Sequence, residues 1–183
     1  MGNLKNKKIA ILSDNGFEQS ELLEPKKALL ESGATVHVVS AQSGKIKAWN
    51  HTDWGVDVEV DVNLQDAKPG DYDGLMIPGG VMNPDKMRAD ENYVNFAKAF
   101  LEAGKAVAAI CHGPQLLIET GVLKGKKMTS YPSIKTDLIN AGVNWEDSEV
   151  VVDKGLVTSR SPKDIPAFNK KMIEEFGEGL HQR

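Results

Sequence analysis

The stretch from Ala106 to Thr120 reads AVAAICHGPQLLIET. Its first five residues are small and apolar and predict a buried strand, and the Gly-Pro pair predicts the start of a helix over Gln115 to Thr120. Cys111 stands between the two elements. A strand that turns sharply into a helix places the side chain at the turn above the carboxyl ends of the strands. The sequence therefore predicts a nucleophile elbow that carries a cysteine.

Short strands and amphipathic helices alternate on both sides of this stretch. Apolar or β-branched runs predict strands at 8–13, 35–40, 72–77, 106–110, 128–131, 150–152 and 156–159. Apolar residues at helical spacing predict helices at 20–32, 93–103, 133–140 and 162–176. Because the connections are short and no linker or repeat interrupts the pattern, we expect an α/β fold layered around a mostly parallel sheet. We expect a single domain over residues 1–183.

The segment from Ile46 to Val62 departs from this alternation. Valine and acidic residues alternate strictly from Val56 to Val62, which is typical of a strand with one face in solvent. We therefore expect an edge β-hairpin in this part of the chain.

Composition narrows the class of protein. The net charge of −4 leaves no basic excess to bind a nucleic-acid backbone, so nucleic acid is not an expected partner. One cysteine in 183 residues excludes a disulfide framework and a cysteine-based zinc cluster, and we expect neither a metal nor a cofactor. No apolar run approaches the roughly 20 residues of a membrane span, and the polar N-terminus lacks a signal-peptide core. A cytoplasmic protein without a membrane partner is the expectation.

Cys111 is the candidate nucleophile. At the N-terminus of a helix, the dipole and the free N–H groups favour a thiolate, and the same N–H groups can hold a substrate oxyanion. The alternative is a small buried apolar residue, which free cysteine often is. His112 follows directly, and on a sharp elbow its imidazole can reach the sulfur as a base, or else hydrogen-bond to the backbone as a structural histidine.

Two further groups are expected at the same edge of the sheet. Glu18 and Glu21 follow the first strand, and either carboxyl could donate a hydrogen bond to the sulfur if its pKa were raised there; both could instead stabilise a helix N-terminus. Gly79 and Gly80 also follow a strand and could offer backbone N–H donors, although a plain turn is the competing interpretation.

Five segments together resemble the DJ-1/PfpI superfamily, and within it the PfpI-like branch: FEQSE at 17–21, IPGG at 77–80, AICHGPQ at 109–115, DLINAG at 137–142 and VTSRSP at 157–162. The resemblance covers roughly residues 8–176. It implies a flavodoxin-like three-layer sandwich with a reactive Cys111 at the elbow. It also implies that the glutamate paired with this cysteine is Glu21 rather than Glu18.

The resemblance implies that the site is shared between subunits. In the PfpI-like branch, the histidine after the cysteine pairs with an acid from a neighbouring subunit, and Asp85 is the matching acid here. The chain has one residue more than usual between the glycines and this acid. A homo-oligomer, either a dimer or a hexamer, would then be required for function.

The activities implied by the resemblance are those of a cysteine-dependent hydrolase or lyase. Family members are described as glyoxalase-type enzymes acting on methylglyoxal, as protein deglycases and as intracellular proteases. We expect a stress-protection enzyme in which the Cys111 thiolate adds to a reactive carbonyl of a small or glycated substrate. The alternatives are a PfpI-type cysteine peptidase and a non-enzymatic redox-sensing protein. A glutamine amidotransferase is not expected, because His181 is followed by Gln182 rather than by the His-x-Glu of that class.

The hairpin differs from the family pattern. Many PfpI-like members have Lys-His-Gly before the alternating strand, where this chain has Asp53-Trp54-Gly55 in a longer hairpin with Trp49 and His51. The tryptophans could contact a ligand at the rim of the pocket or a neighbouring subunit, and the sequence leaves this open.

Overall fold

The computed structural model describes residues 3–182. Its centre is a seven-stranded sheet with the order β11-β12-β8-β7-β1-β3-β6. The pairs of neighbouring strands are parallel except β11 with β12, which are antiparallel. The strands are β1 (Lys8–Leu12), β3 (Thr35–Ser40), β6 (Val62–Asn63), β7 (Gly74–Ile77), β8 (Ala106–Ile110), β11 (Val151–Asp153) and β12 (Leu156–Ser159). The predicted α/β fold with a mostly parallel sheet is confirmed.

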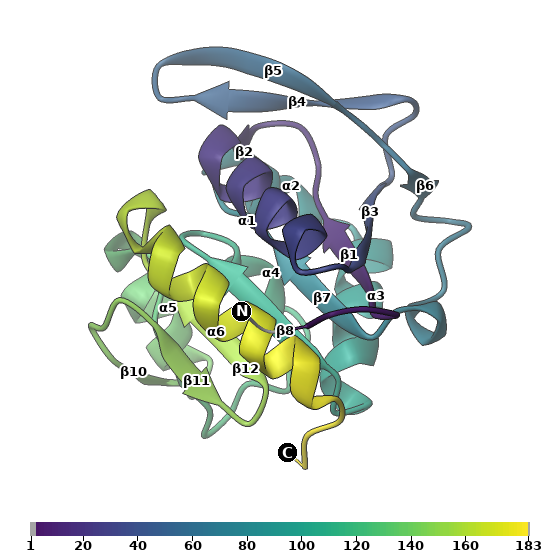
Figure 1. The fold of residues 1–183 in the computed structure, drawn as a ribbon. Helices are drawn as coiled ribbons and strands as arrows, with labels where there is room; N and C mark the ends of the chain where they lie inside the picture. Colours follow the sequence, from purple (N-terminus) through teal and green to yellow (C-terminus); the bar gives the residue numbers. More distant parts are fainter. Residues whose placement is uncertain (1–2, 183) are drawn as a thin grey trace.

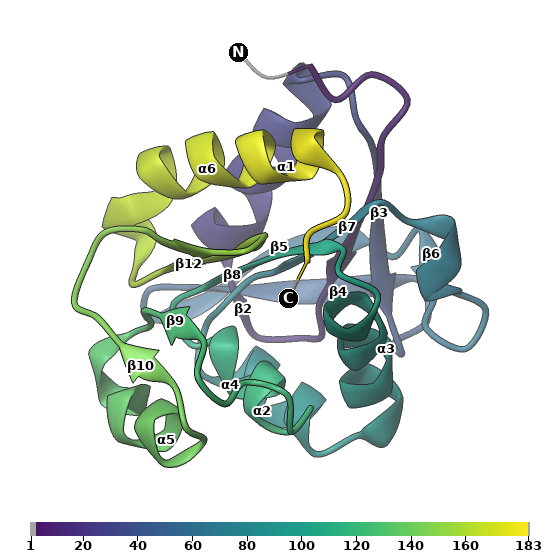
Figure 2. The ribbon, with the colours of Figure 1, turned by 90° about the horizontal axis from the view of Figure 1, so that it is seen from below.

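Helices cover both faces of this sheet, as Figure 2 shows. On one face lie α1 (Gln19–Glu31) and α6 (Ile165–Glu178), which pack against each other. The other face is covered by α2 (Met82–Arg88), α3 (Glu91–Glu102), α4 (Pro114–Ile118) and α5 (Lys135–Asn140). Short 3-10 turns at Pro69–Asp71, Pro132–Ile134 and Pro162–Asp164 join these elements. The arrangement is a three-layer sandwich.

The strands next to the elbow are apolar because both of their faces are covered. All five residues of β8 are buried, and so are all four of β7. Side chains on the two faces form two separate core clusters, one under α3 and α4 and the other under α1 and α6. Burial on both faces explains why these segments carry continuous apolar runs rather than an alternating pattern.

The hairpin is not at the edge of the central sheet, which corrects the expectation for this segment. Its strands β4 (Lys45–Asn50) and β5 (Asp53–Glu59) form a separate three-stranded sheet with β2 (Phe17–Glu18), above α1 in Figure 1. The short β6 alone continues to the edge of the central sheet, beside β3. The alternation of valine and acidic residues therefore indicates burial for only part of the strand: Val58 is buried, whereas Val56 is 46% exposed.

Three elements were not predicted from the sequence. β2 is only two residues long, and β10 (Asn144–Trp145) pairs with β9 (Lys127–Met128) in a two-stranded sheet. The strand predicted at 128–131 overlaps β9 only at Met128, because the next residues leave this sheet and the Tyr131 N–H binds the Cys111 carbonyl. α2 contains Pro84 and only seven residues, too few for a clear helical period.

Within residues 3–182, every helix is too short or too polar to span a lipid bilayer.

Candidate active site

Cys111 occupies a strained backbone position at the end of β8. Its φ angle is +61°, a conformation that residues other than glycine rarely adopt. Two hydrogen bonds hold the backbone of Cys111: its N–H donates to the Ser159 carbonyl at 3.0 Å, and its carbonyl accepts the Tyr131 N–H at 2.9 Å. The predicted elbow is therefore present, and it is fixed from β12 on one side and from the chain after β9 on the other.

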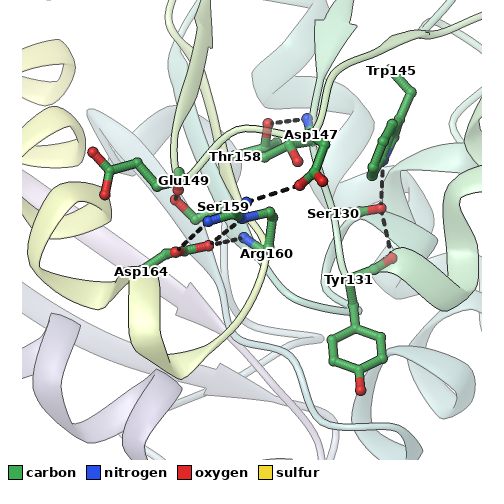
Figure 3. A network of polar contacts seen from close by, with 10 residues as sticks. Ser130, Tyr131, Trp145, Asp147, Glu149, Thr158, Ser159, Arg160 and Asp164 are labelled. Atoms are coloured by element: carbon green, nitrogen blue, oxygen red, sulfur yellow. Dashed lines mark hydrogen bonds and ion pairs between the residues drawn. The ribbon is translucent and has the colours of Figure 1, made fainter.

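Figure 3 shows a polar network around Ser159, whose carbonyl accepts the Cys111 N–H. The Ser159 hydroxyl donates to the Glu149 carbonyl at 2.6 Å. The next side chain, Arg160, donates through Nε to Asp164 at 2.9 Å and through Nη1 to Asp147 at 2.8 Å. Since Arg160 directly follows Ser159, these bonds restrain the backbone that accepts the Cys111 N–H.

The thiol faces a cavity of about 590 Å³. Cys111 is 6% exposed, so its side chain is enclosed except toward this space. The lining combines aromatic and apolar groups with two carboxyl groups and two imidazoles: Glu18, Glu21, Trp49, His51, Gly80, Val81, Met82, Cys111, His112, Tyr131 and Pro162. The cavity is large enough for a small organic molecule.

The structure places Glu21, rather than Glu18, against the cysteine. Glu21 is fully buried on α1, its Oε2 accepts the Gly79 N–H at 3.0 Å, and its carboxyl group interacts with the Cys111 thiol. Burial raises the pKa of this carboxyl from 4.5 to about 8. Glu21 is therefore protonated near neutral pH and can donate a proton or a hydrogen bond toward the cavity.

Burial outweighs the expected effect of the elbow N–H groups on the pKa of the Cys111 thiol. Burial raises the pKa of Cys111, an ionised Glu21 carboxylate would raise it further, and the backbone N–H groups of Gly80 and His112 lower it. The helix that follows, α4, has only five residues and contributes little dipole. The resting sulfur is consequently a thiol, and a base has to remove its proton before it can attack.

His112 lies in position to be that base. Its Nδ1 is 3.2 Å from the Cys111 sulfur and its Nε2 is 3.1 Å from the Ser133 hydroxyl. The ring stacks on Tyr131, with a centroid distance of 4.6 Å and an angle of 23° between the planes. Burial lowers the pKa of His112, so the imidazole is neutral near pH 7 and can accept a proton.

Asp85 does not approach His112 within the chain. It lies exposed in the first turn of α2 and does not line the cavity. In its place, Ser133 pairs with the imidazole, and sequence reasoning missed both this serine and the stacked Tyr131. No motif marked them, because the chain from β9 reaches the elbow only through the folded topology.

The two glycines after β7 are more than a plain turn. The Gly79 N–H is bound to Glu21, and the Gly80 N–H interacts with the Cys111 sulfur. A Cβ atom on Gly79 would lie 2.7 Å from the Cβ of Cys111 and 2.8 Å from the Ile110 carbonyl, so no larger residue fits. Gly80 has a φ of +83°, which also favours glycine.

The two tryptophans of the hairpin differ in position. Trp49 lines the cavity, and its indole N–H donates to the His51 carbonyl at 2.9 Å. Trp54 packs edge-on against Trp49 with ring centroids 5.5 Å apart and is 45% exposed. Glu18 completes this wall, and burial raises the pKa of its carboxyl while His51 opposes the shift.

The cavity residues do not form a metal-ligand cluster among the residues that the structure describes. Over the same part of the chain, one group of possible ligands lies within 4.8 Å of one another, at the end of α6: Glu175, Glu178 and His181. None of the three lines the cavity.

Comparison with known proteins identifies the family of this chain. The DJ-1/PfpI family profile matches residues 7–175. Putative cysteine protease YraA of Bacillus subtilis is 48% identical over 168 residues, 92% of this chain and 97% of that protein. Deglycase PH1704 of Pyrococcus horikoshii is 43% identical, over 91% of this chain and 98% of that protein.

A solved structure shows the same fold. A two-domain protein of Anabaena variabilis, with DJ-1/ThiJ/PfpI-like and ferritin-like domains, superposes with a TM-score of 0.88 at 38% identity. The match covers 94% of this chain and 48% of that one. With the profile, the relatives and the cysteine elbow in agreement, the chain belongs to the DJ-1/PfpI family.

Proposed function

We propose that this chain is a cysteine-dependent stress-protection enzyme that acts on reactive carbonyls, as a glyoxalase-type enzyme or a protein deglycase. One observation carries the proposal: the Cys111 thiol opens into the cavity between a protonated carboxyl and a neutral imidazole. Addition of a thiol to a carbonyl requires one group that removes the sulfur proton and another that protonates the oxygen. Glu21 and His112 supply these two functions.

With a 2-oxoaldehyde, the proposed reaction begins when His112 takes the thiol proton and the sulfur attacks the aldehyde carbon. The carbonyl π pair moves to oxygen, near the Gly80 N–H, and Glu21 protonates it to give a hemithioacetal. Transfer of the C1 proton to C2 through a base gives a thioester. Water then releases the 2-hydroxy acid and returns the thiol, so the net change is the addition of one water.

Cavity size favours a small substrate over a folded protein. About 590 Å³ accommodates a three-carbon aldehyde or a single modified side chain. The relative named deglycase is consistent with this choice. Intracellular peptidase activity is the second candidate, since the relative named putative cysteine protease is 48% identical and the same thiol could attack an acyl group.

The site argues against a purely redox-sensing role. Peroxide attacks the thiolate, and sensor cysteines combine a low pKa with exposure. Here burial raises the pKa of Cys111, and the side chain is nearly enclosed. A reducing compartment such as the cytoplasm would keep this thiol in its reactive form.

We also propose that the active assembly is a homo-oligomer, with Asp85 of one subunit approaching the histidine of another. The exposed position of Asp85 on α2 supports this, since an acid that acts across an interface has to be accessible before assembly. Size-exclusion chromatography with light scattering would test it. A monomer that is fully active would refute it.

The proposed activity is tested by incubating methylglyoxal with the wild-type chain and with Cys111→Ala in a thiol-free buffer, with identification of the product. Surface lysines and arginines scavenge the aldehyde equally in both proteins, so the difference isolates the site. Catalytic formation of lactate by the wild-type chain alone supports the glyoxalase-type reaction. Equal stoichiometric loss in both proteins rejects that reaction, and release of glycated adducts or cleavage of a peptide by the wild-type chain alone would then identify the deglycase or peptidase.

A further inference from the structure

Asn83 is a fully buried amide on α2 that the proposed reaction does not use. Its side-chain NH₂ group donates to the Pro78 carbonyl at 3.0 Å and to the Gly79 carbonyl at 3.2 Å. Its oxygen accepts the Asp14 N–H at 2.6 Å and the Ser13 hydroxyl at 3.2 Å. Both donor hydrogens and both acceptor positions of the amide are thus occupied.

The two carbonyls that Asn83 holds belong to two particular peptide groups. A peptide group is planar, so the direction of its C=O fixes the direction of its N–H. The carbonyl of Pro78 shares a plane with the Gly79 N–H, which binds Glu21. The carbonyl of Gly79 shares a plane with the Gly80 N–H, which faces the cysteine sulfur. One NH₂ group therefore orients both donors that the turn directs at the reactive pair.

Glycine makes this restraint necessary. Gly79 and Gly80 permit the close approach at the site, but glycine also has more backbone conformations available than any other residue. Apart from Asn83, the Glu18 N–H binds the Gly79 carbonyl, at the longer distance of 3.3 Å. Without the amide, the Pro78 carbonyl would lose its bond to Asn83 and the Gly79 carbonyl would keep only the longer bond from Glu18, so the two peptide planes would be held less firmly.

The other side of Asn83 is firmly anchored. Asp14 is 4% exposed and lies two residues after β1, and its carboxylate accepts hydrogen bonds from the Tyr93 hydroxyl at 2.9 Å and from Gln42 at 3.2 Å. The amide thus connects the glycine turn to a rigid part of the central sheet.

We propose that Asn83 is a positioning residue, which holds the two peptide planes of the glycine turn so that their N–H groups face Glu21 and Cys111. It does not contact the cavity and acts only through the turn. The proposal takes from the proposed function only that Cys111 is the reactive group.

The test measures alkylation of Cys111 by iodoacetamide across a range of pH. Since Cys111 is the only cysteine of the chain, the mass shift reports this site alone. Asn83→Ala removes the whole amide, while Asn83→Asp keeps the acceptor side and removes the donor side. We expect both variants to react about tenfold more slowly than the wild-type chain at each fixed pH below the midpoint of the profile, which corresponds to a profile displaced upward by about one pH unit.

Two controls separate positioning from general stability. Tyr93→Phe removes one hydrogen bond to the Asp14 carboxylate and leaves the Asp14 N–H bound to Asn83, so we expect a lower midpoint of urea unfolding with an unchanged alkylation profile. Asn95→Ala makes the same deletion at an exposed position of α3 and should change neither. Because the alanine variant adds no charge, a shift common to both Asn83 variants reports the lost donors.

Folded Asn83 variants that react with the wild-type pH profile would overturn the proposal, and so would an equal shift in Tyr93→Phe. If Asn83→Ala does not fold, Asn83→Asp decides alone, compared with Asn95→Asp. Where carbonyl turnover is measurable, kcat should fall with little change in KM. Failure of all carbonyl turnover in the wild-type chain would reject the proposed function and leave the alkylation result intact.

Discussion

Replacing Glu21 with glutamine should alter how stability depends on pH. The buried carboxyl of Glu21 is held protonated, with its pKa raised from 4.5 to about 8 by burial. Glutamine has nearly the same shape, keeps an oxygen for the Gly79 N–H and cannot ionise. The substitution therefore removes one titration and preserves the packing around it.

The sign and size of the effect follow from linkage. An acid whose pKa is raised on folding stabilises the native state fully below its ordinary pKa of 4.5, and this contribution is lost as the pH rises toward 8. Each pH unit in this window changes the free energy of unfolding by about 1.4 kcal/mol. Between about pH 5 and pH 8, Glu21→Gln should therefore gain roughly 3–4 kcal/mol relative to the wild-type chain.

Urea unfolding at about one-unit intervals over this range, in the presence of a reducing agent, measures the difference directly. Glu24→Gln is the matched control, because it makes the same chemical change at a solvent-exposed position of the same helix. Its curve should stay parallel to the wild-type curve. Parallel curves for Glu21→Gln as well would refute the conclusion that the native state retains a proton on this carboxyl.

Three further changes probe other parts of the site. Gly79→Ala should destabilise the chain by about 1–3 kcal/mol in urea unfolding, because the new methyl group has no space, and a fully stable variant would contradict the tight turn. Ser133→Ala removes a hydrogen bond to His112 and should slow Cys-dependent turnover by about fivefold with little loss of stability, whereas unchanged kinetics would make the contact incidental. Trp54→Ala should lower the free energy of unfolding in urea by about 0.5–1.5 kcal/mol through the lost ring contact with Trp49, and unchanged stability would argue against the pairing.

The local sequence was sufficient to predict elements whose residue pattern lies within one continuous segment. The strands at 35–40, 106–110 and 156–159 match the structure residue for residue. Each is a short run rich in β-branched or small apolar residues, and covered strands of a parallel sheet require such runs. The elbow could be predicted for the same reason, since all its parts are contiguous.

Longer-range features could not be derived in this way. The hairpin shows the period of an edge strand, but its partner is the two-residue β2, which carries no periodicity of its own. Ser133 reaches His112 only because the chain after β9 turns back across the elbow. The thiol pKa depends on burial, which follows from the assembled layers and not from the residues beside Cys111.

The left-handed backbone at Cys111 implies a trade-off between activity and stability. Glycine is the residue that adopts this conformation at least cost, and a residue with a Cβ pays about 1–2 kcal/mol there. Cys111→Gly should therefore be more stable than Cys111→Ala, although both lack the sulfur. Selection for stability alone would remove the side chain on which the chemistry depends, so the thiol persists at this position only as long as its reactivity is needed.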